Sequence, residues 1–220
     1  LANSRGPDTI ADLASNMGAQ AVAAADVVEG VDMLVVSIPQ GAVPQVASLI
    51  ADLRGDVVVV DTGNYYPGLR DQRIDAIEAG MAESLWVAEQ LGRPVIKAFN
   101  SVSFTSLANA GVPAGAPGRM ALPVAGDDPA AKRQVLALID DLGFDAVDAG
   151  SLAESWRQQP GTPVYCTDLD KAGVEQALIM ADRARSPERR DRFIAEMLKI
   201  VRSGGSADLI ALGRSIYGAP

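Results

Sequence analysis

Histidine is absent from these 220 residues, and Cys166 is the only cysteine. Without histidine the chain cannot build a Ser-His-Asp or Cys-His catalytic set, nor a histidine-ligated zinc site. A lone cysteine excludes an internal disulfide, so a reducing compartment, the cytoplasm, is the expected location. No apolar run is long enough to cross a bilayer, and no signal-peptide pattern opens the chain.

Basic residues are also scarce, with 19 Lys and Arg against 28 Asp and Glu and a formal net charge of −9. This balance argues against nucleic acid or an anionic membrane as a partner. An anionic cofactor is still compatible with it, because one local cluster of donors is enough to hold such a molecule. We therefore expect small-molecule partners, and the 48% hydrophobic content is sufficient for a sizeable core.

The stretch from Val31 to Asn64 organises the chain. Two short, β-branched apolar runs, Met33–Ile38 and Val57–Val60, flank a segment of helical length with apolar residues near helical spacing. Unbroken rather than alternating apolarity is typical of strands that are covered on both faces, as in a parallel sheet. The pattern predicts a right-handed βαβ unit whose ligands bind at the carboxyl ends of its strands.

The remaining chain continues this α/β pattern. Further strands are expected at Ala21–Ala24, Pro94–Phe99, Arg119–Ala125 and Phe144–Val147. Pro123 within one of them indicates a bulge or an edge position. From Thr167 onward the pattern is helical, and the Gly204-Gly205 pair separates the last two helices. The expected fold is a mostly parallel sheet with helices on both faces, followed by a small helical C-terminal region at 166–220.

Two turns offer polar groups to a dinucleotide. At the end of the second strand of a dinucleotide-binding fold an acid selects NAD, whereas an arginine suits the 2′-phosphate of NADP. The Asn3-Ser4-Arg5 turn supplies a hydroxyl and a guanidinium, although Arg5 equally suits a solvated terminal position. The second turn, Ser37-Ile38-Pro39, suits the ribose of the nicotinamide half or simply a connection from strand to helix.

A second group of candidates follows the next strands. Asp61 leads into a polar and aromatic loop that contains Asn64, and Asp61 could either serve a ligand or cap backbone donors. Lys97 and Asn100 bracket the end of an apolar strand, and a lysine inside a buried strand is costly unless it is paired or at the rim. It therefore suits a role near cofactor or substrate, or a snorkelling position at the sheet edge. The 156–165 segment suits an aromatic ligand or a packed connection.

Several motifs occur in a fixed order, namely NSRGP, the SIP turn, VVDTGNYYP, VIKAFNS, PVAGDD, and GFDAVDAG up to SWRQQPGTPVY. Together they resemble the NADP-dependent oxidoreductases related to the deazaflavin (coenzyme F420) dependent NADP reductases. The resemblance implies a Rossmann-like domain at 1–165 with NADP as its cofactor. It also implies that Ser4 and Arg5 hold the 2′-phosphate and that Asn3, in the same turn, belongs to the cofactor site. Ser37, Ile38 and Pro39 would lie along the dinucleotide, and Asn64, Lys97 and Asn100 near the nicotinamide and second substrate.

One feature of that family is missing here. Its members begin with a strand and a G-x-G-x-x-G turn that cradles the pyrophosphate, and this sequence contains no such motif. We expect either a fragment of a longer product, which alone would bind dinucleotide poorly, or another segment or partner chain in the place of the missing strand.

The leading hypothesis is an NADP(H)-dependent oxidoreductase that moves a hydride between the nicotinamide and a flat acceptor such as a deazaflavin or flavin. A bare hydride needs no acid or base; if a proton is also required, Lys97 is the candidate donor and Asn100 orients the acceptor. The alternatives are a non-catalytic dinucleotide-binding or sensor module and an inactive truncated remnant completed by oligomer contacts. Surplus apolar residues in the helical tail lead us to expect a homodimer.

Overall fold

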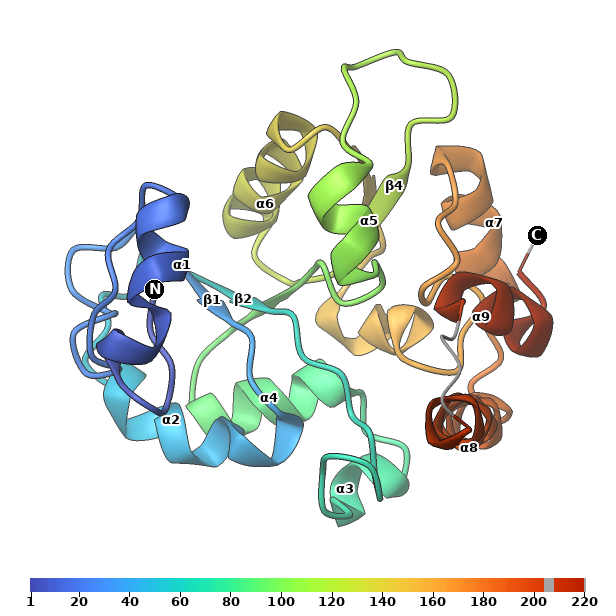
Figure 1. Ribbon diagram of the computed structural model, residues 1–220, viewed down its shortest axis with the longest axis horizontal. Helices are drawn as coiled ribbons and strands as arrows, with labels where there is room; N and C mark the ends of the chain where they lie inside the picture. The colour runs from blue at the N-terminus through green and yellow to red at the C-terminus, as the bar shows by residue number, and fades with distance from the viewer. Residues whose placement is uncertain (204–207, 220) are drawn as a thin grey trace.

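The computed structural model describes residues 1–203 and 208–219, and a parallel sheet lies at its centre (Figure 1). Its strand order is β1-β2-β3, with β1 at Met33–Val36, β2 at Val58–Asp61 and β3 at Ile96–Lys97. β1 and β2 pair in register from Met33 opposite Val58, and the helix α2 (Val43–Ile50) connects them. The predicted βαβ unit is confirmed.

The packing of β2 explains why its apolar run is unbroken. Val59 packs into a core cluster that includes residues of α2 and of α4 (Glu83–Leu91), two helices that run side by side below the sheet in Figure 1. Val58 and Val60 belong to a second cluster, which includes Val135 and Ile139 of α6 (Pro129–Asp141). The strand is therefore buried on both faces, and helices cover both sides of the sheet.

A second parallel pair, β4 (Ala121–Val124) and β5 (Asp145–Asp148), flanks the main sheet. The two sheets are joined by an antiparallel bridge, in which Lys97 N donates to Ala125 O at 2.8 Å and Ala125 N donates to Lys97 O at 3.0 Å. Pro123 lies opposite Val147 in the β4–β5 pair, and it has no N–H to donate. Within its two-stranded sheet β4 has a strand on one side only, in keeping with the edge position expected for Pro123.

Residues 1–32 contain no strand, so the strand expected at Ala21–Ala24 is wrong. This stretch forms the 3-10 helix η1 (Pro7–Ile10), α1 (Ala11–Asn16) and turns. Val22 N donates to Leu1 O at 2.9 Å and the Leu1 amino terminus donates to Gln20 O at 2.6 Å, but these two contacts do not make a strand. Small alanine side chains bury too little apolar area to hold a strand against the sheet. In the described chain β1 therefore lies at the sheet edge, with Val35 50% exposed.

The region after Thr167 is helical, as predicted, with α7 at Lys171–Met180, α8 at Ser186–Arg202 and α9 at Leu209–Tyr217. The Gly204-Gly205 break lies outside the described residues. α7 packs on β4 and β5, while α8 and α9 enclose Tyr165 in an aromatic cluster with Phe193 and Tyr217. The tail is thus packed on the rest of the fold, and the domain boundary at 165 stays a prediction.

Shorter elements complete the described chain, namely the 3-10 helices η2 (Gln40–Ala42) and η3 (Leu152–Gln158) and the α-helices α3 (Asp75–Glu78) and α5 (Phe104–Asn109). Among the described residues we find no helix with both the length and the apolar character that a membrane span requires.

Candidate functional site

The loops that follow β1 and β2 pack against each other at the carboxyl edge of the sheet. Thr62 N donates to Val36 O at 3.1 Å, and the Asp61 carboxylate accepts from Gly63 N at 2.8 Å. A Cβ on Gly63 would lie 3.0 Å from both Asp61 Oδ1 and Gln40 Oε1, which are buried. Only glycine lets the two loops approach this closely.

Lys97 lies beneath this junction in a buried ion pair. Its Nζ is 3.0 Å from Asp61 Oδ2, which also accepts from Ser84 Oγ at 2.7 Å, and Nζ donates to Gly63 O as well. The exposed fractions of the Lys97 and Asp61 side chains are 0% and 2%. Such a pair is tolerated because hydrogen bonds replace the lost water. Asp61 thus caps a turn, as one of its two interpretations expected, and also pairs with Lys97.

Glu83, the first residue of α4, holds the same loop from the helix side. Its carboxylate accepts from Tyr65 N at 3.2 Å, its carbonyl accepts from Gln40 Nε2 at 3.2 Å, and its N–H donates to Gln159 Oε1 at 3.1 Å. Burial raises the pKa of the Glu83 carboxyl to about 7, although the positive charge of Lys97 acts in the opposite direction. The protonated and ionised forms are therefore both accessible near neutral pH.

An amide network joins the strand ends to η3. Asn64 Nδ2 donates to Asn100 O at 3.0 Å, and Asn100 Nδ2 donates to Asn64 Oδ1 at 3.1 Å and to Gln158 O at 2.7 Å. Gln158 Nε2 in turn donates to Asn100 Oδ1 at 3.0 Å. Phe99, next to Asn100, has a left-handed backbone with φ of 62°, a conformation that non-glycine residues keep where the surroundings enforce it.

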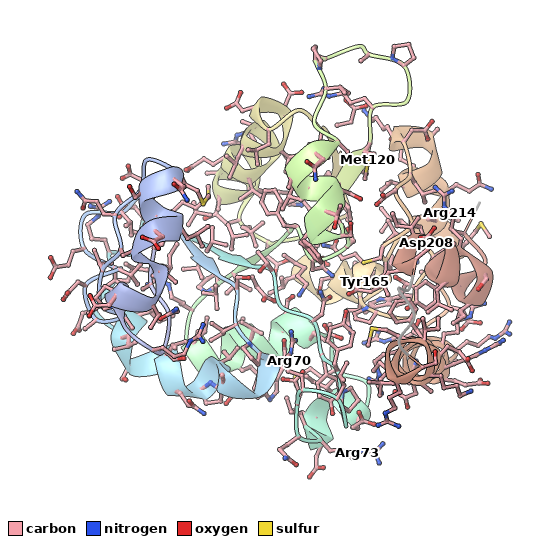
Figure 2. The ribbon with its side chains drawn as sticks, viewed as in Figure 1. Arg70, Arg73, Met120, Tyr165, Asp208 and Arg214 are labelled. Carbon is pink, nitrogen blue, oxygen red and sulfur yellow. The ribbon has the colours of Figure 1, made fainter. Side chains whose placement is uncertain are left out.

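Tyr66 and Arg70 form the outer side of this loop. Arg70 Nη2 donates to Asn64 O, and the guanidinium carbon lies 5.1 Å from the centre of the Tyr66 ring. The Tyr66 hydroxyl is hydrogen-bonded to that of Tyr165, and burial raises the pKa of Tyr66. Figure 2 shows Tyr165 between this region and the C-terminal helices, so the aromatic cluster of the tail reaches the site loop.

The structure brings some predicted site residues together and leaves others apart. Asn64, Lys97 and Asn100 share the contacts above, and the 37–39 turn adjoins them, since a Cβ on Gly63 would lie 3.9 Å from Ile38 O. Ser4 and Arg5 lie in an exposed turn held by Asn3, whose Oδ1 accepts from Arg5 N at 3.0 Å. Within 1–203 and 208–219, no hydrogen bond or ion pair links that turn to the other site residues, so its role stays a prediction.

The polar side chains of the predicted site suit the nicotinamide end and the 2′-phosphate end of NADP better than the pyrophosphate between them. Arg5 is an exposed guanidinium suited to a 2′-phosphate, and half-buried Asn64 offers an amide at the strand ends. Within the described residues the pyrophosphate has no comparable partner, and the sequence holds no G-x-G-x-x-G turn. The described residues would therefore position the ring and the 2′-phosphate, with weak support between them.

A separate hollow of about 470 Å³ lies away from this loop, between β5 and α7. Its lining includes Asp148, Arg157 and Glu175, and Arg157 Nε is already 2.6 Å from Glu154 Oε2. The network of buried polar contacts at the strand ends is a stronger indication of a functional site than this hollow.

Comparison with known proteins agrees with the fold and the motif series. Residues 1–65 match the family model described as "NADP oxidoreductase coenzyme F420-dependent". The chain is 42% identical over 105 residues to "Putative protein YjhV" of Escherichia coli K12, which is 48% of this chain and 77% of that one.

Two solved structures are also similar to this chain. The "hypothetical protein SMa0349" of Sinorhizobium meliloti is similar with a TM-score of 0.64 and 31% identity over 77% of this chain and 82% of that chain. The "putative f420 dependent nadp-reductase" from Arthrobacter sp. FB24 is similar with a TM-score of 0.52 and 21% identity, over 64% of this chain and 66% of that chain. The latter likeness supports the fold alone.

Proposed function

Because this chain belongs to the family of coenzyme F420-dependent NADP oxidoreductases, we propose that it moves a hydride between the nicotinamide of NADP(H) and a flat acceptor such as a deazaflavin or flavin. The observation that supports this most directly is the interlocked set of amides at the carboxyl ends of β2 and β3, where Asn64 and Asn100 bond to each other. Ligands of open α/β sheets bind at such an edge.

The residues at this edge would act by positioning. When bound, the dinucleotide supplies or accepts the hydride, and the protein has only to align two rings. Asn64 and Asn100, whose amides bond to each other and to Gln158, would fix the shape of the edge that the nicotinamide and the acceptor meet. Ser37, Ile38 and Pro39 would form the neighbouring wall. Asn3, Ser4 and Arg5 are proposed for the 2′-phosphate.

Lys97 fits positioning better than the proton donation that its sequence context suggested. Its ammonium is enclosed, 0% exposed, and already engaged with Asp61 and Gly63 O. A buried, paired ammonium is poorly placed to reach a substrate. We therefore propose that Lys97 holds the Gly63–Asn64 segment in place, and that the transfer needs no protein acid.

Titration with NADPH and NADH tests the cofactor assignment. We expect NADPH to bind more tightly, and Arg5→Gln to reduce that preference about tenfold or more, because a hydrogen bond to a charged group contributes roughly 1.5–3 kcal/mol. Arg133→Gln, which removes an exposed arginine from α6, is the matched control and should change nothing. Equal binding of the two cofactors, or a preference for NADH, would contradict a role for Arg5 as a phosphate clamp.

A non-catalytic dinucleotide sensor is the second candidate, and the enclosure of Lys97 favours it, because none of the proposed site residues then presents an accessible acid or base. Hydride exchange between NADPH and a panel of flavins, deazaflavins and quinones separates the two functions. Turnover with any of these acceptors would eliminate the sensor, whereas cofactor binding without turnover would eliminate the oxidoreductase.

A further inference from the structure

Arg70 lies in a tight loop, residues 66–71, next to the candidate site. Tyr66 O accepts hydrogen bonds from the backbone N–H of Leu69, Arg70 and Asp71 at 3.3, 3.1 and 3.1 Å, which turns the chain back on itself. The guanidinium consequently lies over the Tyr66 ring and bonds Asn64 O, the carbonyl of a proposed site residue. No part of this arrangement was predicted from the sequence.

The carboxylate beside Arg70 is largely committed to other donors. Asp71 Oδ1 accepts from Gly41 N at 3.1 Å and Asp71 Oδ2 accepts from Tyr66 N at 2.9 Å, while Arg70 Nε is 3.5 Å away. The Asp71 side chain is 0% exposed, whereas that of Arg70 is 40% exposed. Arg70 is thus oriented by its contacts with Asn64 O and Asp71, while part of its side chain remains exposed to solvent.

We propose that Arg70 binds an anionic group, a phosphate or carboxylate, on the hydride acceptor. This inference rests on the proposed hydride transfer for the identity of the ligand, and it adds the chemical class of the second substrate. Arginine suits such a role because its planar fork pairs with two oxygens of a phosphate or carboxylate. Its contact with Asn64 O places that charge beside the proposed ring position.

Arg73 provides a natural comparison three residues further along. Its side chain is 73% exposed, and its Nη2 is 3.0 Å from Glu78 Oε2, so its charge is paired at the surface. Figure 2 shows Arg73 at the outer rim beside α3, whereas Arg70 lies further inward. A change at Arg73 alters the net charge of the molecule equally but leaves the site loop intact.

Riboflavin and FMN test the inference because they share one ring system and differ by a phosphate. We expect the intact chain to bind FMN at least tenfold more tightly than riboflavin, as measured by quenching of flavin fluorescence without any NADPH. Arg70→Gln should abolish the preference, Arg70→Lys should keep part of it, and Arg73→Gln should leave it unchanged. Near-UV circular dichroism confirms that each variant is folded.

The outcomes separate this inference from the proposed function. Equal binding of the two flavins, or an FMN preference that survives in Arg70→Gln, would overturn the role of Arg70 even if NADPH is oxidised. A loss of NADPH affinity in Arg70→Gln, with flavin binding unchanged, would also overturn it, because the arginine would then serve the cofactor. An Arg70-dependent FMN preference without hydride transfer would uphold the anion site and reject the oxidoreductase.

Discussion

At the scale of single residues, Glu83 makes the stability of the protein depend on pH. Its carboxyl pKa is raised from 4.5 to about 7 by burial at the start of α4. A raised pKa in the folded state means that its contribution to stability is fully present below pH 4.5 and is lost as the pH rises through about 7. The chain has no histidine, so few other side chains titrate in this window.

We therefore expect the free energy of unfolding to fall between pH 5 and pH 8, by at most about 3 kcal/mol. Urea unfolding at several pH values measures this slope. Glu83→Gln should flatten it, because the amide oxygen can still accept from Tyr65 N without any charge. Glu89→Gln, at an exposed position of the same helix, is the control and should leave the slope intact. An unchanged slope in Glu83→Gln would show that another group is responsible.

Lys97 gives a second prediction at this scale. Lys97→Met leaves the Asp61 charge buried without its partner, so we expect a loss of roughly 3–5 kcal/mol in the free energy of unfolding. Adding Asp61→Asn removes that charge but keeps an oxygen that can accept from Gly63 N, and should recover part of the loss. A double variant no more stable than Lys97→Met would mean that the ion pair is not what holds the loop.

At the scale of elements, the sequence predicted well wherever one local pattern decides the structure. The unbroken apolar run at 57–60 identified β2 because both of its faces are buried. Asn64, Lys97 and Asn100 were predicted from their places at strand ends, and the structure brings them together, while their role toward a ligand stays a prediction. Gln158, Glu83 and Arg70 were missed, since their contacts span 58, 18 and 6 residues and depend on how separate elements meet.

η3 contacts both sheets through Gln158, which is 0% exposed and bonded to Asn100. Its Nε2 lies 3.4 Å from Lys97 O of β3 and 3.4 Å from Pro123 O of β4. Gln158→Ala removes this donor and leaves a space, so we expect a loss of about 1–3 kcal/mol and faster exchange of the Asn100 side-chain amide in NMR spectra. Gln134→Ala, at an exposed position of α6, should have neither effect. Unaltered exchange at Asn100 in Gln158→Ala would show that η3 does not hold the site.

At the scale of the whole molecule, the C-terminal helices belong to the same packed body as the sheet. α7 buries Val174, Ala177 and Leu178 in a cluster with Ala121 of β4 and Val147 of β5. The tyrosine pair Tyr66–Tyr165 adds a hydrogen bond between the site loop and the aromatic cluster under α8 and α9. The tail should therefore affect the stability of the site as well as any assembly of chains.

Two neighbouring residues of α7 separate these effects. Leu178 is 8% exposed and Ile179 is 80% exposed, so Leu178→Asp buries a charge whereas Ile179→Asp places one in water. We expect Leu178→Asp, like truncation near Lys171, to give insoluble or unfolded protein, and Ile179→Asp to change stability by less than about 0.5 kcal/mol. Light scattering of the intact chain and of Ile179→Asp reports the mass and tests the expected homodimer. A truncated chain that is soluble and compact, and that assembles with the same number of chains as the intact protein, would show instead that the tail is dispensable for both folding and assembly.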